Sequence, residues 1–215
     1  MKNILRPIHD YCERLSTPPS QVLYELERET HLKTLAPQML SGKLQGQLLQ
    51  LISQLQQPQR ILEIGTFTGY ASICLAQGLA EEGILHTIEA NPELEYIIRK
   101  YIAKAGLEKK INLHIGNAKN IIPGLKEQFD LIFLDAGKQH YAFYYDLVFD
   151  MVKPGGLILA DNVLWSGKVT DAELVKKDAD TRLLHEFNVK VQQDKRVENV
   201  LLPLRDGLLV VRKRE

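Results

Sequence analysis

The stretch R-I-L-E-I-G-T-F-T-G-Y-A-S, residues 60–72, joins a short apolar run to a helical segment through a turn that contains two glycines. Gly65 and Gly69 allow the backbone to approach a ligand closely and present N–H groups at a helix start. Their G-x-x-x-G spacing differs from the dinucleotide fingerprint G-x-G-x-x-G, so NAD is not the first choice of ligand. A tight turn after a strand can also need glycine for purely structural reasons, so the stretch indicates a ligand site only together with other features.

The alternation of apolar run and helical segment continues after this turn. A helix is expected over residues 71–80, and further apolar runs end at four positions: Glu89, Gly116, Asp135 and Asp161. Five such runs separated by helices predict βαβ units, and therefore a parallel sheet flanked by helices. K-P-G-G, residues 153–156, is expected to lead into the fifth strand. Two final runs joined by R-D-G, residues 205–207, predict an antiparallel hairpin that closes the sheet.

Length and composition indicate one globular domain, residues 1–215. A helical N-terminal cap (residues 1–57) ends in a Gln-rich amphipathic helix stopped by Pro58, and a core (residues 58–215) follows. Lys plus Arg and Asp plus Glu both number 27, so the net charge of zero gives no footprint for nucleic acid or an anionic membrane. With no leader pattern, no apolar run of membrane-spanning length and two distant cysteines, Cys12 and Cys74, we expect a reduced cytoplasmic setting, with Cys74 in the core.

An acidic residue ends the second predicted strand. Glu89 stands 24 residues after Gly65, where a carboxylate can accept hydrogen bonds from ribose hydroxyls in a doubly wound sheet. An ordinary surface carboxylate is the plain alternative. The glycine turn and the acidic strand end together favour a ligand that carries a nucleoside.

Three polar side chains follow two strands that read as buried on both faces. Asp135 follows F-D-L-I-F-L, and Asp161 and Asn162 follow L-I-L-A. Carboxylates placed there without partners would cost several kcal/mol. Two carboxylates and an amide oxygen suit a hard divalent cation. The alternative is that they cap the following helices or pair with Lys138 or Lys168.

Lys138 lies three residues after Asp135. A partly desolvated lysine beside a metal can act as a general base. The alternative is a surface lysine that neutralises Asp135.

Taken together, the motifs L-E-I-G-T-F-T-G-Y-A-S, T-I-E-A-N, F-L-D-A-G-K and A-D-N-V-L-W-S-G resemble those of class I S-adenosylmethionine-dependent O-methyltransferases. More narrowly, they are similar to the cation-dependent catechol and caffeoyl-CoA O-methyltransferases, from about Met39 to the C-terminus. The resemblance implies an α/β fold: a Rossmann-like, doubly wound, seven-stranded sheet, mostly parallel, with helices on both faces and a helical N-terminal extension. The last strand would insert antiparallel between its neighbours.

The resemblance also implies the site. The divalent cation, Mg²⁺ first with Mn²⁺ or Ca²⁺ as alternatives, would bind Asp135, Asp161 and Asn162, and Lys138 would be the catalytic base. Residues implied to bind S-adenosylmethionine are Met39, Gly42, Glu63, Gly65, Thr66, Phe67, Gly69, Tyr70, Ala71, Glu89, Ala90, Asn117, Ala118 and Asp135.

This chain departs from the family pattern at three places. Asn117 stands where the family usually has an acidic residue, and Ala71 stands where a serine is common, although Ser72 follows at once. Gly137 and Gln139 replace acidic residues that are common around the lysine, which loosens the substrate side. None of these departures touches the three expected metal ligands.

The resulting prediction is a cation-dependent O-methyltransferase that acts on a small catechol-type aromatic acceptor, a CoA ester included, and forms a homodimer. Trp165, Tyr141 and Tyr144 are candidates for an aromatic wall of the acceptor site, with core packing as the alternative. Two other readings stay open: a metal-independent small-molecule methyltransferase of the same fold, and a non-catalytic binding module that uses the helical cap.

Overall fold

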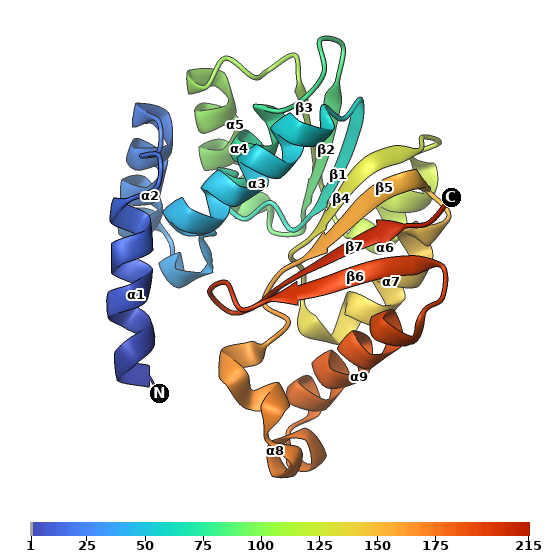
Figure 1. Ribbon diagram of the computed structural model, residues 1–215. Helices are drawn as coiled ribbons and strands as arrows, with labels where there is room; N and C mark the ends of the chain where they lie inside the picture. Colours follow the sequence, from blue (N-terminus) through green and yellow to red (C-terminus); the bar gives the residue numbers. More distant parts are fainter. Residues whose placement is uncertain (1) are drawn as a thin grey trace.

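The computed structural model describes residues 2–215, and Met1 of the predicted cap lies outside the described residues. A single seven-stranded sheet runs through the molecule in the order β3-β2-β1-β4-β5-β7-β6 (Figure 1). Its strands are β1 Arg60–Ile64, β2 Ile84–Glu89, β3 Ile111–Ile115, β4 Phe129–Leu134, β5 Val152–Ala160, β6 Val197–Leu202 and β7 Leu208–Lys213.

Helices connect and cover these strands. The α-helices are α1 Lys2–Arg14, α2 Gln21–Lys33, α3 Gly42–Gln56, α4 Tyr70–Ala76, α5 Glu95–Lys104, α6 Ala118–Ile121, α7 Tyr141–Phe149, α8 Ala172–Lys177 and α9 Ala179–Gln193. Short 3-10 helices are η1 Pro37–Met39, η2 Pro92–Leu94, η3 Ile122–Gly124, η4 Lys138–His140 and η5 Trp165–Thr170.

The strand pairing confirms the predicted topology. β1 pairs in parallel with β2 and β4, and the parallel series continues to β3 on one side and β5 on the other. β7 is antiparallel to both of its neighbours, β5 and β6. The last strand therefore inserts between two earlier ones, and the carboxyl ends of β1, β2, β4 and β5 share one edge of the sheet.

Alternate residues of the strands pack into two apolar cores, one on each face. Ile61, Leu131 and Leu159 meet α2, α3, α4 and α5 on one face. Leu62 and Ile132 meet α6, α7 and α9 on the other. The period-2 alternation of a strand sends neighbouring side chains to opposite faces, so both faces need covering by helices.

Two predicted boundaries are wrong. The helix expected over residues 71–80 ends at Ala76, because Gly78 packs on α3 so closely that a Cβ there would lie 2.2 Å from the carbonyl carbon of Ser53. K-P-G-G was expected to precede β5 but lies inside it. Between the Phe129–Val152 and Leu131–Leu157 pairs, β4 advances by two residues and β5 by five, so the segment forms a bulge.

The N-terminal cap packs against the sheet's helical layer. α3 lies on α4, and α2 contacts both α4 and α5; in Figure 1, α1 and α2 stand at the outer side of this layer. Cys74 of α4 is buried in this core, as predicted. Within residues 2–215, no helix is long and apolar enough to cross a membrane. The homodimer, the cytoplasmic location and the single-domain assignment stay predictions.

Candidate active site

The glycine turn (residues 65–69) joins β1 to α4 and needs its glycines. Gly65 has φ +100°, and a Cβ at this position would lie 1.9 Å from the backbone oxygen of Asp135. Gly69, with φ 92°, precedes the first residue of α4. The turn therefore brings the backbone of β1 against the end of β4, and no residue with a side chain fits at Gly65 without displacing that strand end.

Glu89 holds this turn from the end of β2. Its side chain is buried; Oε2 accepts a hydrogen bond of 2.7 Å from the Phe67 backbone N–H, and Oε1 accepts one of 2.8 Å from that of Asn91. Burial raises the pKa of Glu89, while these backbone hydrogen bonds lower it. Each carboxylate oxygen can accept a second hydrogen bond, so Glu89 can hold the turn and a ligand hydroxyl together.

Glu63 lies beneath the turn in a buried polar cluster. Its Oε2 accepts hydrogen bonds from the Ser72 hydroxyl and, at 2.5 Å, from the Thr87 hydroxyl. Thr66 and Thr87 share a further hydroxyl hydrogen bond of 2.5 Å. Within residues 2–215, Glu63 Oε1 is buried without a hydrogen-bond partner. Burial raises the pKa of Glu63 to about 7.

The hydrogen bond from the Ser72 hydroxyl to Glu63 determines whether Ser72 can contact a ligand at the turn. Because its hydroxyl donates to Glu63 inside the core, Ser72 is engaged below the turn. It does not replace the serine that is missing at Ala71.

The backbone ladder carries Asp135, Asp161 and Asn162, the strand-end trio, to one point of the sheet edge. The Asp135 N–H donates to Ile64 at 2.9 Å, and the Asp161 N–H donates to Leu134 at 3.0 Å. Asn162 has φ 60°, a left-handed conformation that asparagine tolerates. The chain turns there, and the Asn162 side chain lies against Asp135.

Short contacts join the members of the trio. Asn162 Nδ2 lies 3.1 Å from Asp135 Oδ1, and the Asn162 backbone N–H donates to Asp161 Oδ1 at 2.8 Å. Burial and then repulsion from Asp161 raise the pKa of Asp135. Burial also raises the pKa of Asp161, against hydrogen bonds from Gln45 and Asn162. The predicted cluster is therefore brought together, with two carboxyl groups in a site that disfavours their charge.

The trio contains fewer than three charged or otherwise strong metal ligands. Across residues 2–215, no three His, Cys, Asp or Glu side chains converge as a metal site would require. The trio supplies two carboxylates and one amide, so a cation here would depend on the amide oxygen and on oxygens from water or substrate.

Lys138 and the aromatic candidates separate into two groups. Lys138 Nζ lies 3.9 Å from the centroid of the half-buried Trp165 ring, a cation–π contact. Tyr141 and Tyr144 are buried in the core, and the Tyr141 hydroxyl donates to the backbone oxygen of Asp161 at 2.7 Å. Tyr141 and Tyr144 are packing residues, and Trp165 remains the aromatic candidate for the acceptor side.

The remaining cofactor candidates lie around the same edge. Asn117 caps α6 by accepting from the Lys119 N–H at 3.0 Å, which leaves its amide N–H groups to donate to a ligand. Ala118 is buried, Ala90 is exposed, and Met39 is 58% exposed. Gly42 begins α3 with φ 73°. The structure shows where these residues lie, and their contacts with a ligand stay predictions.

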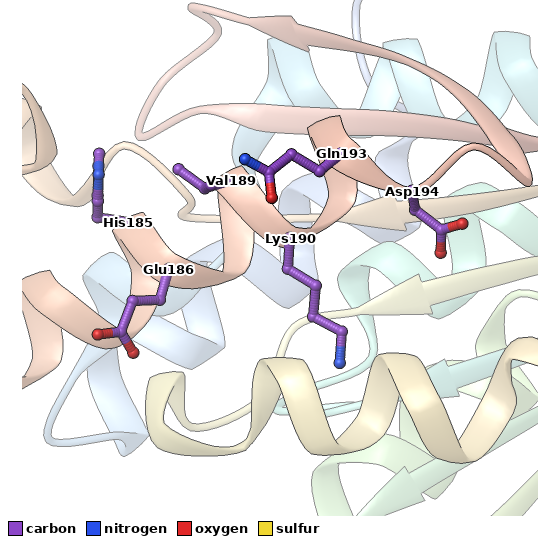
Figure 2. Close-up of a pocket in the computed structure, with 6 residues that line it drawn as sticks. All are labelled: His185, Glu186, Val189, Lys190, Gln193 and Asp194. Carbon is purple, nitrogen blue, oxygen red and sulfur yellow. The ribbon is translucent and has the colours of Figure 1, made fainter.

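A hollow of about 590 Å³ opens elsewhere, along α9. Figure 2 shows the residues that line it: His185, Glu186, Val189, Lys190, Gln193 and Asp194. Lys190 is paired there with Asp146 at 2.5 Å. None of the predicted site residues lines this hollow, so we place the candidate site at the sheet edge, where the chemistry-bearing side chains converge.

With this geometry established, comparison with known proteins is decisive. A family model described as O-methyltransferase matches residues 13–214. The chain belongs to the O-methyltransferase family. This membership assigns the enzyme class.

This O-methyltransferase resembles curated relatives at moderate identity. It is 42% identical over 131 residues to a catechol O-methyltransferase of Niastella koreensis, a match that covers 59% of each chain. It is 33% identical to probable caffeoyl-CoA O-methyltransferase 2 of Dictyostelium discoideum, over 81% of this chain and 78% of that one.

Solved structures match over nearly the whole chain. The SAH-bound methyltransferase PaMTH1 of Podospora anserina superposes with a TM-score of 0.90 at 28% identity, covering 99% of this chain and 96% of that one. The O-methyltransferase TomG of Streptomyces achromogenes, in complex with SAM, gives 0.89 at 29% identity, covering 97% and 96%. The Rossmann-like methyltransferase fold predicted from the sequence is confirmed.

Sequence reasoning missed two residues of this O-methyltransferase. Gln45 is fully buried on α3 and bonds to Asp161, and Arg205 reaches the same region from the β6–β7 turn. A signal existed for Gln45, since it stands four residues before the buried Leu49 on one stripe of the helix. Arg205 gave no comparable signal, because a turn arginine is ordinarily solvated.

Proposed function

We propose that this protein transfers a methyl group from S-adenosylmethionine to a hydroxyl oxygen of a small catechol-type aromatic acceptor, CoA esters included, with a divalent cation bound by the strand-end trio. One observation carries the proposal. Asn162 lies within hydrogen-bond distance of both Asp135 and Asp161, and Asp135 adjoins the glycine turn.

The chemistry of the trio fits a hard cation. The two neighbouring carboxylates repel each other, which is part of why the pKa of Asp135 is raised, and a positive ion would offset that repulsion. Because an amide can be turned by 180° about its last bond, Asn162 can present its oxygen instead of its nitrogen. When bound, the cation would hold vicinal acceptor oxygens and lower the pKa of the reacting hydroxyl. Mg²⁺ is proposed first because the ligand set is all oxygen.

The chain's own residues would position the reactants. In the transfer, the carbon–sulfur bond of the donor would break as the carbon–oxygen bond forms in line with it, and the acceptor proton would pass to Lys138 Nζ, which the step requires as the neutral amine. Glu89 and the glycine turn would hold the nucleoside and methionine parts of the donor. The Trp165 face lies against Lys138 Nζ and would stabilise the ammonium group formed when the lysine takes the proton. Orientation of the reactants supplies much of the rate in a displacement reaction.

The acceptor class is proposed from two supports. The relatives named above are a catechol O-methyltransferase and a probable caffeoyl-CoA O-methyltransferase. Trp165, half-buried beside Lys138, offers a flat apolar surface for an aromatic ring.

Labelled methyl transfer to a panel of catechols tests this function, with Mg²⁺ and with EDTA. We expect transfer that stops with EDTA and returns with added Mg²⁺, and that is lost in Asp161→Asn but kept in Asp180→Asn, an exposed aspartate on α9. Transfer that ignores both EDTA and Asp161→Asn would instead support a metal-independent methyltransferase of the same fold.

A further inference from the structure

Gln45 of α3 connects the N-terminal cap to the strand-end trio. Its side chain is fully buried, and its Nε2 donates a hydrogen bond of 2.5 Å to Oδ2 of Asp161. Its Oε1 accepts from Arg205 Nη1 at 3.5 Å. We propose that Gln45 is a positioning residue that holds the Asp161 carboxylate in the orientation required for cation binding. The inference rests on the proposed function, because it assumes that Asp161 is a cation ligand.

The two neighbours of Gln45 determine which way its amide faces. An ionised Asp161 can only accept hydrogen bonds, and the Arg205 guanidinium can only donate them. Only one orientation satisfies both, with Nε2 toward Asp161 and Oε1 toward Arg205. The amide is therefore fixed, and it presents a donor to the carboxylate.

Two hydrogen bonds then fix the plane of the Asp161 carboxylate. Oδ2 accepts from Gln45, and Oδ1 accepts from the backbone N–H of Asn162 at 2.8 Å. Since each carboxylate oxygen has two lone-pair sites, one site on each oxygen is left for a ligand. Without Gln45, Oδ2 loses this restraint and the carboxylate can rotate about its last torsion.

Arg205 is itself held tightly. It has φ 50°, a left-handed conformation that is costly for arginine and persists where surrounding contacts over-determine it. Its guanidinium donates to the backbone oxygen of Ser41, at the start of α3. In the same turn, the backbone oxygen of Asp206 accepts a hydrogen bond of 2.8 Å from the N–H of Leu164, which stands two residues after Asn162. The turn thus fastens α3 to the segment that carries the trio, which keeps Gln45 in place.

Binding of Mn²⁺ to the whole protein, without S-adenosylmethionine or acceptor, tests the inference. Electron paramagnetic resonance of free Mn²⁺ gives the dissociation constant. Gln45→Met keeps the length and the helix preference of the side chain but removes the donor. We expect it to weaken Mn²⁺ binding about 10- to 100-fold, the usual cost of losing a partner of a metal ligand. Gln54→Met is the matched control, because Gln54 is exposed on the same helix, and it should leave the affinity unchanged.

Two further variants separate the possible outcomes. Asp161→Asn should itself weaken Mn²⁺ binding. If it does while Gln45→Met binds like the wild type, the positioning role is wrong and the cation site stands. If Asp161→Asn binds like the wild type, the cation site and this inference both fail. Should Gln45→Met not fold, as judged by circular dichroism, Gln45→Asn replaces it; its amide is one methylene too short to reach Asp161, and the same loss is expected.

Discussion

Replacing Glu63 by Gln should shift the stability of the cofactor-free protein in favour of the variant as pH rises. Glu63 is fully buried, and burial raises its pKa from 4.5 to about 7. Between these two values the unfolded chain releases this proton and the folded chain keeps it. Stability of the wild type therefore falls as pH rises across this window, and the loss is complete above the folded pKa. Glutamine cannot ionise, so Glu63→Gln escapes this loss.

The size of the effect follows from the shift. One pKa unit corresponds to about 1.4 kcal/mol, so the raised pKa of Glu63 lowers the free energy of unfolding by about 3 kcal/mol near pH 8 and by about 1 kcal/mol near pH 5.5. Glutamine Oε1 can accept the same hydrogen bonds from Ser72 and Thr87. Its NH₂ group would take the place of Oε1 of Glu63, which lacks a partner among the described residues. That cost, about 1–3 kcal/mol, is the same at both pH values, so it cancels from the difference of about 2 kcal/mol between them.

Thermal or urea unfolding of the wild type and of Glu63→Gln at both pH values measures this difference. For a chain of this size, 1 kcal/mol moves Tm by about 2–4 °C, so the gain from the substitution should be about 4–8 °C larger near pH 8 than near pH 5.5. Glu108→Gln, at an exposed position, should show no such dependence. An equal effect of Glu63→Gln at the two pH values would refute the reasoning, because it would mean that Glu63 is not protonated in the folded protein.

Two other substitutions probe the backbone around the site. Gly65→Ala places a Cβ 1.9 Å from the Asp135 oxygen at a positive φ; it should cost about 3 kcal/mol or more and abolish S-adenosylmethionine binding in calorimetry. Gly124→Ala, which meets open space, is its control, and retained binding in Gly65→Ala would contradict the fit of the turn. Tyr141→Phe removes the buried hydroxyl that donates to the Asp161 backbone at 2.7 Å and should cost about 1–2 kcal/mol in urea unfolding. A cost indistinguishable from zero would mean that this hydrogen bond adds no net stability.

The arrangement of the strands was predictable because it depends on local patterns. Short apolar runs separated by helical segments indicate a parallel sheet, and R-D-G indicates the final hairpin. The errors arose where tertiary contacts override these patterns. α4 ends earlier than predicted, where Gly78 packs against Ser53 of α3. The bulge in β5 depends on the pairing of this strand with β4, which the K-P-G-G segment does not reveal by itself.

The sequence by itself determined the sheet, the glycine turn and the convergence of Asp135, Asp161 and Asn162. The carboxyl ends of adjacent parallel strands must meet at one edge, so residues placed there by the chain's periodicity are brought together by topology. Tertiary structure alone decided that Gln45 bonds to Asp161 across 116 residues and that Arg205 reaches Ser41 across 164. Such contacts depend on how the cap packs on the sheet and on which hydrogen-bond partner a buried amide finds there. No local spacing in the sequence encodes that geometry.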